Sequence, residues 1–338
     1  MNLRLRAIAH YLVAAALYYS GALALRRRYR RLTHRREISV LGLHRVLTAQ
    51  QAESTCSEQA LVITQPTFHK LLQELTQQFH VLSLSDFQCG NIPDGSKPSC
   101  MLTFDDGWMD TYENAYPALR DARMPATVFV PTGLIGSDSF FWTERLSCLW
   151  RSCGEDQAFS SAIGQELGLG SVEGLQQSIA AFKQVPATRR EFVLRALEAQ
   201  FANGTQPGKH DKFMSWEQLL AMAPVFEAAS HTVSHILLDI EEPLVVESEL
   251  RESLETLQEN TGTAVQSLAY PSGSFNQRVC TWAADAGYRW AFTTRSGAFC
   301  VGDDPLTVPR SLLQEGNITN PWGGFSPAMF HLRLTGWL

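Results

Sequence analysis

The sequence lacks several patterns that would assign it to a simple class. Its seven cysteines are odd in number and include no Cys-x-x-Cys pair, which argues against a disulfide framework or a zinc ribbon and is typical of a reducing compartment. No Gly-rich dinucleotide fingerprint follows any apolar segment. Only 18% of the residues are charged, while 45% are hydrophobic. This composition excludes a disordered chain or a coiled coil and indicates a chain that buries a full core.

Acidic residues are absent from the first 36 positions, which carry nine arginines. The rest of the chain therefore has 19 basic residues against 34 acidic ones. A body this acidic is poorly suited to contact the phosphates of a nucleic acid, so we expect no nucleic-acid partner.

A run of 19 uncharged residues occupies positions 7–25. As a helix it would extend about 28 Å, close to the thickness of one hydrocarbon core, whereas its His, Ser, Gly and Tyr residues favour a helix lying at the membrane interface. Seven arginines follow at positions 26–36. We expect residues 1–36 to attach the protein to a membrane surface, either spanning the bilayer or lying on it. The positive-inside rule then places the main domain in the cytoplasm, with a periplasmic or extracellular location as the alternative.

Beyond residue 36, short apolar segments alternate with helix-length patterns. The expected strands are residues 38–43, 101–104, 127–130, 226–229, 267–270, 290–293 and 306–312. The expected helices are residues 66–79, 109–121, 215–222, 245–260 and 275–286. This alternation indicates an α/β fold with a parallel sheet. Seven strands without a dinucleotide fingerprint favour a complete or incomplete barrel over a Rossmann sheet.

Residues 137–213 break the alternation, because their apolar spacing is helical in pattern and includes no convincing strand. We interpret this segment as a helical insertion within a domain that covers residues 37–338. Insertions that follow barrel strands lie on the ligand-binding face, so this one forms either a wall or lid over a site or a decoration without a role there.

Polar side chains follow two of the predicted strands. Asp105 and Asp106 come directly after the strand at 101–104, and Gly107 permits a tight turn. Because adjacent side chains diverge, one carboxylate can ligate a metal while the other acts as a base. His231 and His235 follow the strand at 226–229, and their i, i+4 spacing predicts one helical face that presents both imidazoles to a cation. Since parallel strands end at one barrel mouth, two His and one Asp predict a catalytic divalent-metal site, with zinc as the default.

A third strand ends in Leu-Ala-Tyr-Pro-Ser-Gly at 268–273, a turn that can present a backbone N–H to an oxyanion. Together with Thr-Phe-Asp-Asp-Gly at 103–107 and Ser-His-x-x-x-His at 230–235, this turn resembles the motifs of the polysaccharide deacetylases, the carbohydrate esterase family 4 that shares the NodB-homology domain. The resemblance covers about residues 39–313. It implies a distorted (β/α)7 barrel and metal-dependent removal of acetyl groups from an N-acetylated glycan.

The resemblance also implies roles for individual residues. Asp105 corresponds to the general base, and the metal ligands correspond to Asp106, His231 and His235. The turn supplies Tyr270 and Ser272 as oxyanion and substrate contacts, with the donor at the backbone N–H of Ser272.

The chain departs from the family pattern at two places. The third motif usually carries an arginine that orients the base, but Ala269 occupies that position, and we predict Arg310 as its substitute. The late Leu-His motif that supplies a general acid is not recognisable, and His331 is expected to belong to a tail. His44 begins a His-Arg pair similar to the Tyr-His-Arg entry of a membrane-associated branch of the family. It is either a catalytic residue or a buried structural histidine.

We therefore expect a membrane-associated, metal-dependent hydrolase that removes N-acetyl groups from an acetylated glycan or a lipid-linked sugar. Two alternatives are an allantoinase-like hydrolase of small cyclic amides and a noncatalytic glycan-binding protein of the same fold. Within the insertion, Trp142 and Trp150 either stack on a sugar or belong to the core.

Overall fold

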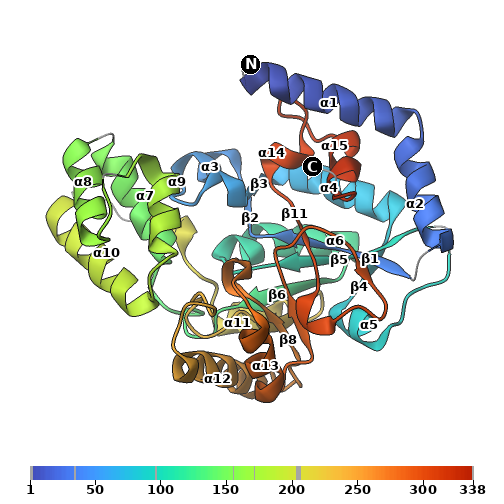
Figure 1. The fold of residues 1–338 in the computed structure, drawn as a ribbon. Coiled ribbons are helices and arrows are strands. Elements are labelled where there is room, and N and C mark those ends of the chain that lie inside the picture. Colours follow the sequence, from blue (N-terminus) through green and yellow to red (C-terminus); the bar gives the residue numbers. More distant parts are fainter. Residues whose placement is uncertain are drawn as a thin grey trace.

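The computed structural model, which describes residues 3–33, 36–95, 97–154, 156–170, 172–202 and 207–336, is built around a curled sheet (Figure 1). Its strands follow the order β10–β1–β5–β6–β7–β8–β9, and every neighbouring pair is parallel except β10 with β1. The strands are β1 (Glu37–Leu43), β5 (Ser99–Phe104), β6 (Ala126–Val130), β7 (Phe226–Ser230), β8 (Ser267–Ala269), β9 (Trp290–Phe292) and β10 (Phe299–Cys300).

The two edges of this sheet are joined by the segment that follows β10. Val308 forms a parallel bridge to Phe292 of β9, and β11 (Ser311–Leu312) pairs in parallel with β1. The seventh strand predicted at 306–312 is thus only two residues long, because Pro305–Thr307 form a 3₁₀ turn and proline lacks the N–H that a strand donates. The result confirms the mixed α/β fold with a distorted barrel.

Helices cover the outside of the barrel largely where the apolar spacing predicts them. These are α4 (Gln65–Gln78), α6 (Tyr116–Ala122), α11 (Trp216–Ala221), α12 (Pro243–Thr261) and α13 (Gln277–Ala286). A π-helical turn at Thr111–Ala115 precedes α6. Sequence patterns did not predict the short elements β2 (Arg45–Leu47), β3 (Val62–Thr64), β4 (His80–Leu82), α3 (Ala49–Ser54), α5 (Leu84–Cys89), α14 (Glu315–Ile318) and α15 (Pro327–Arg333).

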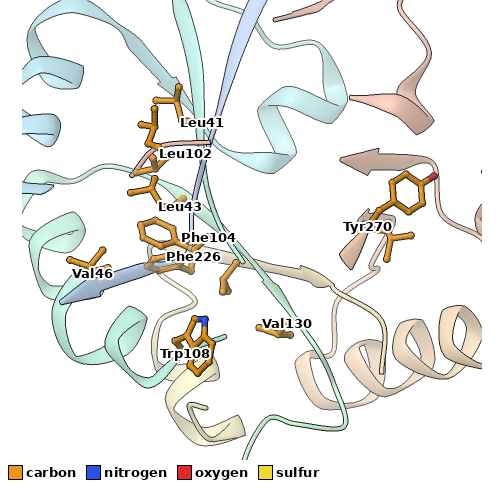
Figure 2. Packing of buried hydrophobic residues seen from close by; sticks show 14 of the residues in the cluster. Leu41, Leu43, Val46, Leu102, Phe104, Trp108, Val130, Phe226 and Tyr270 are labelled. Atoms are coloured by element: carbon orange, nitrogen blue, oxygen red, sulfur yellow. The ribbon is translucent and has the colours of Figure 1, made fainter. Parts of the chain in front are cut away.

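The barrel strands are buried on both faces, as the apolar runs of parallel strands require. Along β1, Val40 packs with Met101 and Phe129 inside the barrel, whereas Leu41 and Leu43 belong to the larger cluster beneath the helices. Figure 2 shows part of that larger cluster. Because successive side chains alternate between faces, one strand contributes to both cores.

The predicted insertion is helical and lies to one side of the barrel (Figure 1). In its described part, residues 137–213 contain α7 (Trp142–Cys153), α8 (Gln157–Glu166), α9 (Gly174–Phe182) and α10 (Ala187–Phe201). These helices bury a core of their own that includes Phe159 and Phe182. Trp142 and Trp150 pack against this core, so of the two roles considered for them the structure supports the structural one.

One disulfide connects the barrel to the insertion. Cys56, which follows α3, is bonded to Cys148 of α7, with the two Cα atoms 5.5 Å apart. The expectation that the cysteines form no disulfide is therefore wrong. The partners are 92 residues apart in sequence, and the odd number of cysteines and their spacing carry no information about which two of them the fold brings together.

The apolar run at 7–25 is divided between α1 (Leu3–Tyr19) and α2 (Ala22–Thr33), and Gly21 adopts a φ of 79° between them. Ala14 and Leu23 pack against Ala328, Met329 and Leu332 of α15. A single helix through this run is therefore not formed. No helix in the described part of the chain is both long enough and apolar enough to cross a membrane.

His331 belongs to α15 and is buried, so the expectation that it lies in a tail is wrong. Its Nε2 atom lies 2.7 Å from Glu74 Oε1, and its ring stacks on Tyr18 of α1 and on Phe79. This histidine therefore helps to connect α1 and α15 to the barrel.

Candidate metal centre and active site

The two carboxylates that follow β5 face different partners. The backbone of Asp106 has a φ of 76° and that of Gly107 a φ of 68°, so the chain turns sharply at the end of the strand. A Cβ atom at position 107 would lie 2.7 Å from Ile135 Cδ1, which explains why glycine is required there. The turn separates Asp105 from Asp106 as the divergence of adjacent side chains predicts.

Asp105 forms a bidentate ion pair with Arg310. The Arg310 Nη1 and Nη2 atoms donate to the two carboxylate oxygens of Asp105 at 2.6 and 2.7 Å, and both side chains are buried. Arg310 Nε also donates to the Thr293 carbonyl at 2.9 Å. Burial alone would raise the pKa of Asp105, but the charge and hydrogen bonds of Arg310 lower it below its ordinary value. Asp105 is thus an ionised, oriented carboxylate, in the position expected of a base.

His231 and His235 lie on a loop after β7, so the helical face predicted for them does not exist. Thr232 and His235 have φ values of 68° and 56°. The Oε2 atom of Glu249, on α12, accepts the backbone N–H groups of residues 233 and 234, both at 2.8 Å. A buried carboxylate and two left-handed residues therefore fold the loop so that both imidazoles reach one point.

The three predicted ligands meet at Asp106 Oδ1. The Nε2 atoms of His231 and His235 each lie 3.4 Å from this oxygen, and the ligand atoms of all three residues lie within 4.8 Å of one another. Asp106 Oδ1 is buried and has no hydrogen-bond partner in the described part of the chain. Tetrahedral zinc bonds of about 2.0–2.1 Å place ligand atoms roughly 3.4 Å apart. An orphaned oxygen and two imidazoles at this spacing fit a divalent metal ion.

The protonation of the two histidines suits metal binding. His231 Nδ1 lies 2.7 Å from the Ala269 carbonyl, which accepts only, so Nδ1 carries the proton and the lone pair of Nε2 faces Asp106. Burial lowers the pKa of His235 to about 3, which keeps its imidazole neutral. Burial would raise the pKa of Asp106, but the histidines around it lower it below its ordinary value.

The turn after β8 carries the two residues predicted as oxyanion and substrate contacts. Ser272 has a φ of 54°, a strained conformation of the kind that is common at functional sites. Tyr270 is fully buried, and its hydroxyl donates to the Leu306 carbonyl at 3.1 Å. The Tyr270 side chain therefore packs in the core and is not the predicted substrate contact.

His44 lies beside the base. Its Nε2 atom is 3.8 Å from Asp105 Oδ2, and 16% of its side chain is exposed to solvent. Of the two interpretations considered for His44, this placement favours a residue of the site over a buried structural histidine.

Two further residues contact the predicted metal ligands, and the sequence interpretation missed them. Trp108 Nε1 donates to Asp106 Oδ2 at 3.0 Å, and the Phe141 ring centroid lies 4.6 Å from that of His235. Trp108 follows Asp-Asp-Gly directly, a signal that could have identified it. Nothing in the sequence identifies Phe141, which lies at the start of the insertion. The insertion therefore forms part of the wall of the site.

Comparisons with known proteins agree with this geometry. The polysaccharide deacetylase family model matches residues 93–157 and 193–291, on both sides of most of the helical insertion. The chain is 21% identical over 238 residues to the poly-β-1,6-N-acetyl-D-glucosamine N-deacetylase of Staphylococcus aureus, covering 68% of this chain and 60% of that protein. The chain spans about 60% of the length of the curated relatives that it matches.

Solved structures share the fold. The Streptococcus pyogenes deacetylase PplD has a TM-score of 0.56 at 19% identity, covering 87% of this chain and all of that one. IcaB from Ammonifex degensii has a TM-score of 0.55 at 18% identity, covering 90% of this chain and 99% of the other. The motifs at the ends of β5, β7 and β8 all lie within the residues that the family model matches, so these residues form a polysaccharide deacetylase domain. The solved deacetylases share its curled barrel.

Proposed function

We propose that this protein is a metal-dependent hydrolase that removes N-acetyl groups from an acetylated glycan. One observation carries the proposal: a carboxylate held by a buried arginine lies beside an Asp-His-His cluster with an orphaned ligand oxygen. The Arg310 pair supplies the orientation of the base that the family pattern assigns to an arginine at the position of Ala269.

The residues of the chain have distinct tasks in this reaction. A divalent ion held by Asp106, His231 and His235, most simply zinc, would supply Lewis-acid chemistry that polarises the amide carbonyl and makes water a stronger nucleophile. Asp105 accepts the proton of the water whose oxygen attacks the carbonyl carbon, and Arg310 keeps Asp105 ionised and oriented. The C–N bond then breaks, which yields acetate and a free amine on the sugar.

Two groups complete the proposal. The backbone N–H of Ser272 donates to the oxyanion that develops on the carbonyl oxygen. His44, beside Asp105 and partly exposed, delivers the proton that the leaving nitrogen requires. These assignments give the attack of water a proton acceptor, Asp105, and the breaking of the C–N bond a proton donor, His44.

The test is acetate release by the full-length protein from β-1,6-linked N-acetylglucosamine oligomers and from a lipid-linked N-acetylated sugar. The protein is stripped with a chelator and then assayed with and without added zinc. We expect metal-dependent release that Asp105→Asn and His231→Ala abolish, while the exposed control variants Asp285→Asn and His69→Ala retain it. Metal-loaded protein that releases no acetate from either substrate would contradict the proposal.

We also propose that α1 and α2 attach the protein to an anionic membrane surface. The side of α1 that faces away from α15 is apolar, and Leu5, Leu12 and Tyr19 are 58%, 57% and 76% exposed. Leu25 of α2 is 69% exposed, next to the arginines of the same helix. Exposed apolar side chains beside arginines suit a helix that lies in the headgroup region of anionic lipids.

Vesicle flotation tests this attachment. The full-length protein should float with phosphatidylcholine vesicles that contain phosphatidylglycerol and much less with phosphatidylcholine alone. The double variant Leu5→Ser/Leu12→Ser should lose binding. Leu244→Ser, which changes a leucine 79% exposed on the distant helix α12, should bind as wild type does. Equal binding by both variants would refute the proposed surface.

Finally, we propose that the domain works in an oxidising compartment outside the cytoplasm, the alternative to the location predicted from the arginine run. The Cys56–Cys148 disulfide supports this location, because such bonds persist where thiols are not kept reduced. When cells are lysed directly into a maleimide reagent, Cys56 and Cys148 should react only after reduction. Labelling of both without reduction would place the domain in a reducing compartment.

A further inference from the structure

The indole of Trp108 lies directly behind a proposed metal ligand. Its Nε1 atom donates to Asp106 Oδ2 at 3.0 Å, while Asp106 Oδ1 faces the two histidines. Trp108 is fully buried. The hydrogen bond therefore selects which carboxylate oxygen is turned toward the imidazoles. Partners of this kind, which touch a ligand but not the metal, typically set its orientation.

Trp108 is itself held by an arginine over its ring and by two aromatic rings. The guanidinium carbon of Arg45 lies 4.2 Å from the ring centroid. The Phe213 ring stacks on the indole at 5.2 Å with an interplanar angle of 20°, and Phe141 contacts it edge-on at 5.1 Å. The position of the indole N–H therefore depends on Arg45 and on both ends of the helical insertion.

Arg45 is fully buried and is fixed by side chains from separate segments. Its Nε donates to Asp110 Oδ1 at 2.7 Å, and its Nη1 donates to Ser57 Oγ at 2.5 Å and Asp211 Oδ1 at 3.0 Å. Ser57 Oγ in turn donates to Glu144 Oε1 of α7 at 3.0 Å. A buried arginine with charged partners in this geometry has little freedom to move.

The disulfide closes this network. Cys56 lies between two residues that contact Arg45, Thr55 and Ser57, and its backbone N–H donates to Asp211 Oδ2 at 3.1 Å. The bond to Cys148 holds this segment against α7. A continuous series of contacts thus runs from the disulfide through Arg45 and Trp108 to Asp106.

We infer that Trp108 is a positioning residue for Asp106 and that Arg45 and the Cys56–Cys148 disulfide hold Trp108 in the orientation that binds metal. The inference rests on the metal centre of the proposed function. Its consequence is that reduction of the disulfide weakens metal binding although no ligand is changed. The insertion and the disulfide then form a structural support of the metal site.

The first experiment compares two Trp→Phe variants of the full-length protein. Trp108→Phe keeps an aromatic ring between Arg45 and Phe213 and removes the N–H donated to Asp106. Trp150→Phe is the matched control, because it removes an indole N–H that donates to Ser178 Oγ at 3.1 Å within the insertion. Zinc affinity is measured by competition with a chelator, and cobalt is substituted to record its visible absorption.

We expect Trp108→Phe to bind zinc about 10–100-fold more weakly, as is typical when a partner of a ligand is removed, and to alter the cobalt spectrum. Trp150→Phe should match wild type in both measurements. Equal zinc affinity in the two variants would overturn the inference while leaving the metal centre intact. Failure of the wild-type protein to bind metal would instead refute the metal centre of the proposed function.

The second experiment changes only the disulfide. Wild type and Trp108→Phe are each compared before and after treatment with a phosphine, which is oxidised to its oxide as the disulfide takes up two electrons and two protons. Reduction should weaken zinc binding several-fold in wild type and much less in Trp108→Phe, because linked contacts are not additive. The double variant Cys56→Ser/Cys148→Ser should not respond to the phosphine. An equal loss in wild type and in Trp108→Phe would overturn the proposed connection.

Discussion

Replacing Arg310 by methionine tests the proposed orientation of the base. Methionine keeps much of the buried volume but leaves the carboxylate of Asp105 without its two charged donors at 2.6 and 2.7 Å. Hydrogen bonds to charged groups contribute roughly 1.5–3 kcal/mol each, and breaking one side of a buried ion pair costs about 3–5 kcal/mol. We expect Arg310→Met to lower the free energy of unfolding by about 3–5 kcal/mol.

A double-mutant cycle separates the pair from general damage to the core. Arg310→Met, Asp105→Asn and the double variant are unfolded in urea without metal. The double variant should lose clearly less stability than the sum of the single variants, because Arg310→Met no longer strands a charge when residue 105 is neutral. Arg295→Met, which changes an exposed arginine on the neighbouring segment, is the control and should cost little. Strict additivity would refute the reasoning.

The same pair predicts a dependence on pH. Arg310 lowers the pKa of Asp105 below its ordinary value, so the stability that the pair contributes is present above the ordinary pKa of an Asp and is lost as the pH falls through the lowered pKa. In Arg310→Met burial still raises the pKa of Asp105, and the largest opposing contribution is gone, so this pKa is higher than in wild type. The acid limb of the kcat/KM profile should therefore move to higher pH than in wild type, and an unchanged acid limb would contradict the role of Asp105 as base.

Three further predictions concern residues around the site. Burial raises the pKa of Glu144 from 4.5 to about 7, so wild type should lose stability as the pH rises between these values, on the order of 3 kcal/mol in total. The urea midpoints of Glu144→Gln should not change with pH in this way. A pH dependence that persists in Glu144→Gln would show that another group causes it. Reduction of Cys56–Cys148 removes a cross-link between residues 92 apart and should lower the free energy of unfolding by about 4–5 kcal/mol in the chain-entropy account. Urea denaturation with and without phosphine measures this loss, and an unchanged midpoint would refute it. Gly273 has a φ of 68°, and a Cβ there would overlap the Thr294 side chain. Gly273→Ala should therefore reduce both the melting temperature and acetate release. The control Gly316→Ala, which has open space around its Cβ position, should reduce neither. Wild-type behaviour of Gly273→Ala would show that the turn tolerates a side chain.

Local patterns were sufficient for the elements whose apolar residues recur over several turns or along a whole strand. The helices at 65–78, 243–261 and 277–286 and the strand at 99–104 agree with their predictions to within a few residues, because burial selects the same periodicity that the sequence displays. The strand predicted at 306–312 was too long and the short elements β2, β3 and β4 were missed, because two or three residues are too few to show a period.

The Asp-His-His cluster of the candidate metal centre could also be predicted from the sequence, since residues at the carboxyl ends of parallel strands converge regardless of the details of the barrel. The helical face that was predicted to bring the two histidines together is nevertheless absent. His231 and His235 meet at Asp106 through a loop held by Glu249, not on a helical face. Similarly, Tyr270 belongs to a motif of the site, yet its side chain turns into the core.

The sequence was enough to establish the family, the alternation of strands and helices, and the identity of the candidate base and ligands, because each of these depends on residues close together in the chain. The tertiary structure alone revealed the pairing of Cys56 with Cys148 and the hydrogen bond from Trp108 to Asp106 within its network around Arg45. It also gave the bidentate geometry of the ion pair between Asp105 and Arg310, the substitute that the sequence predicted 205 residues away. Such contacts depend on how distant segments pack, and packing is a property of the whole chain that no local pattern of residues records.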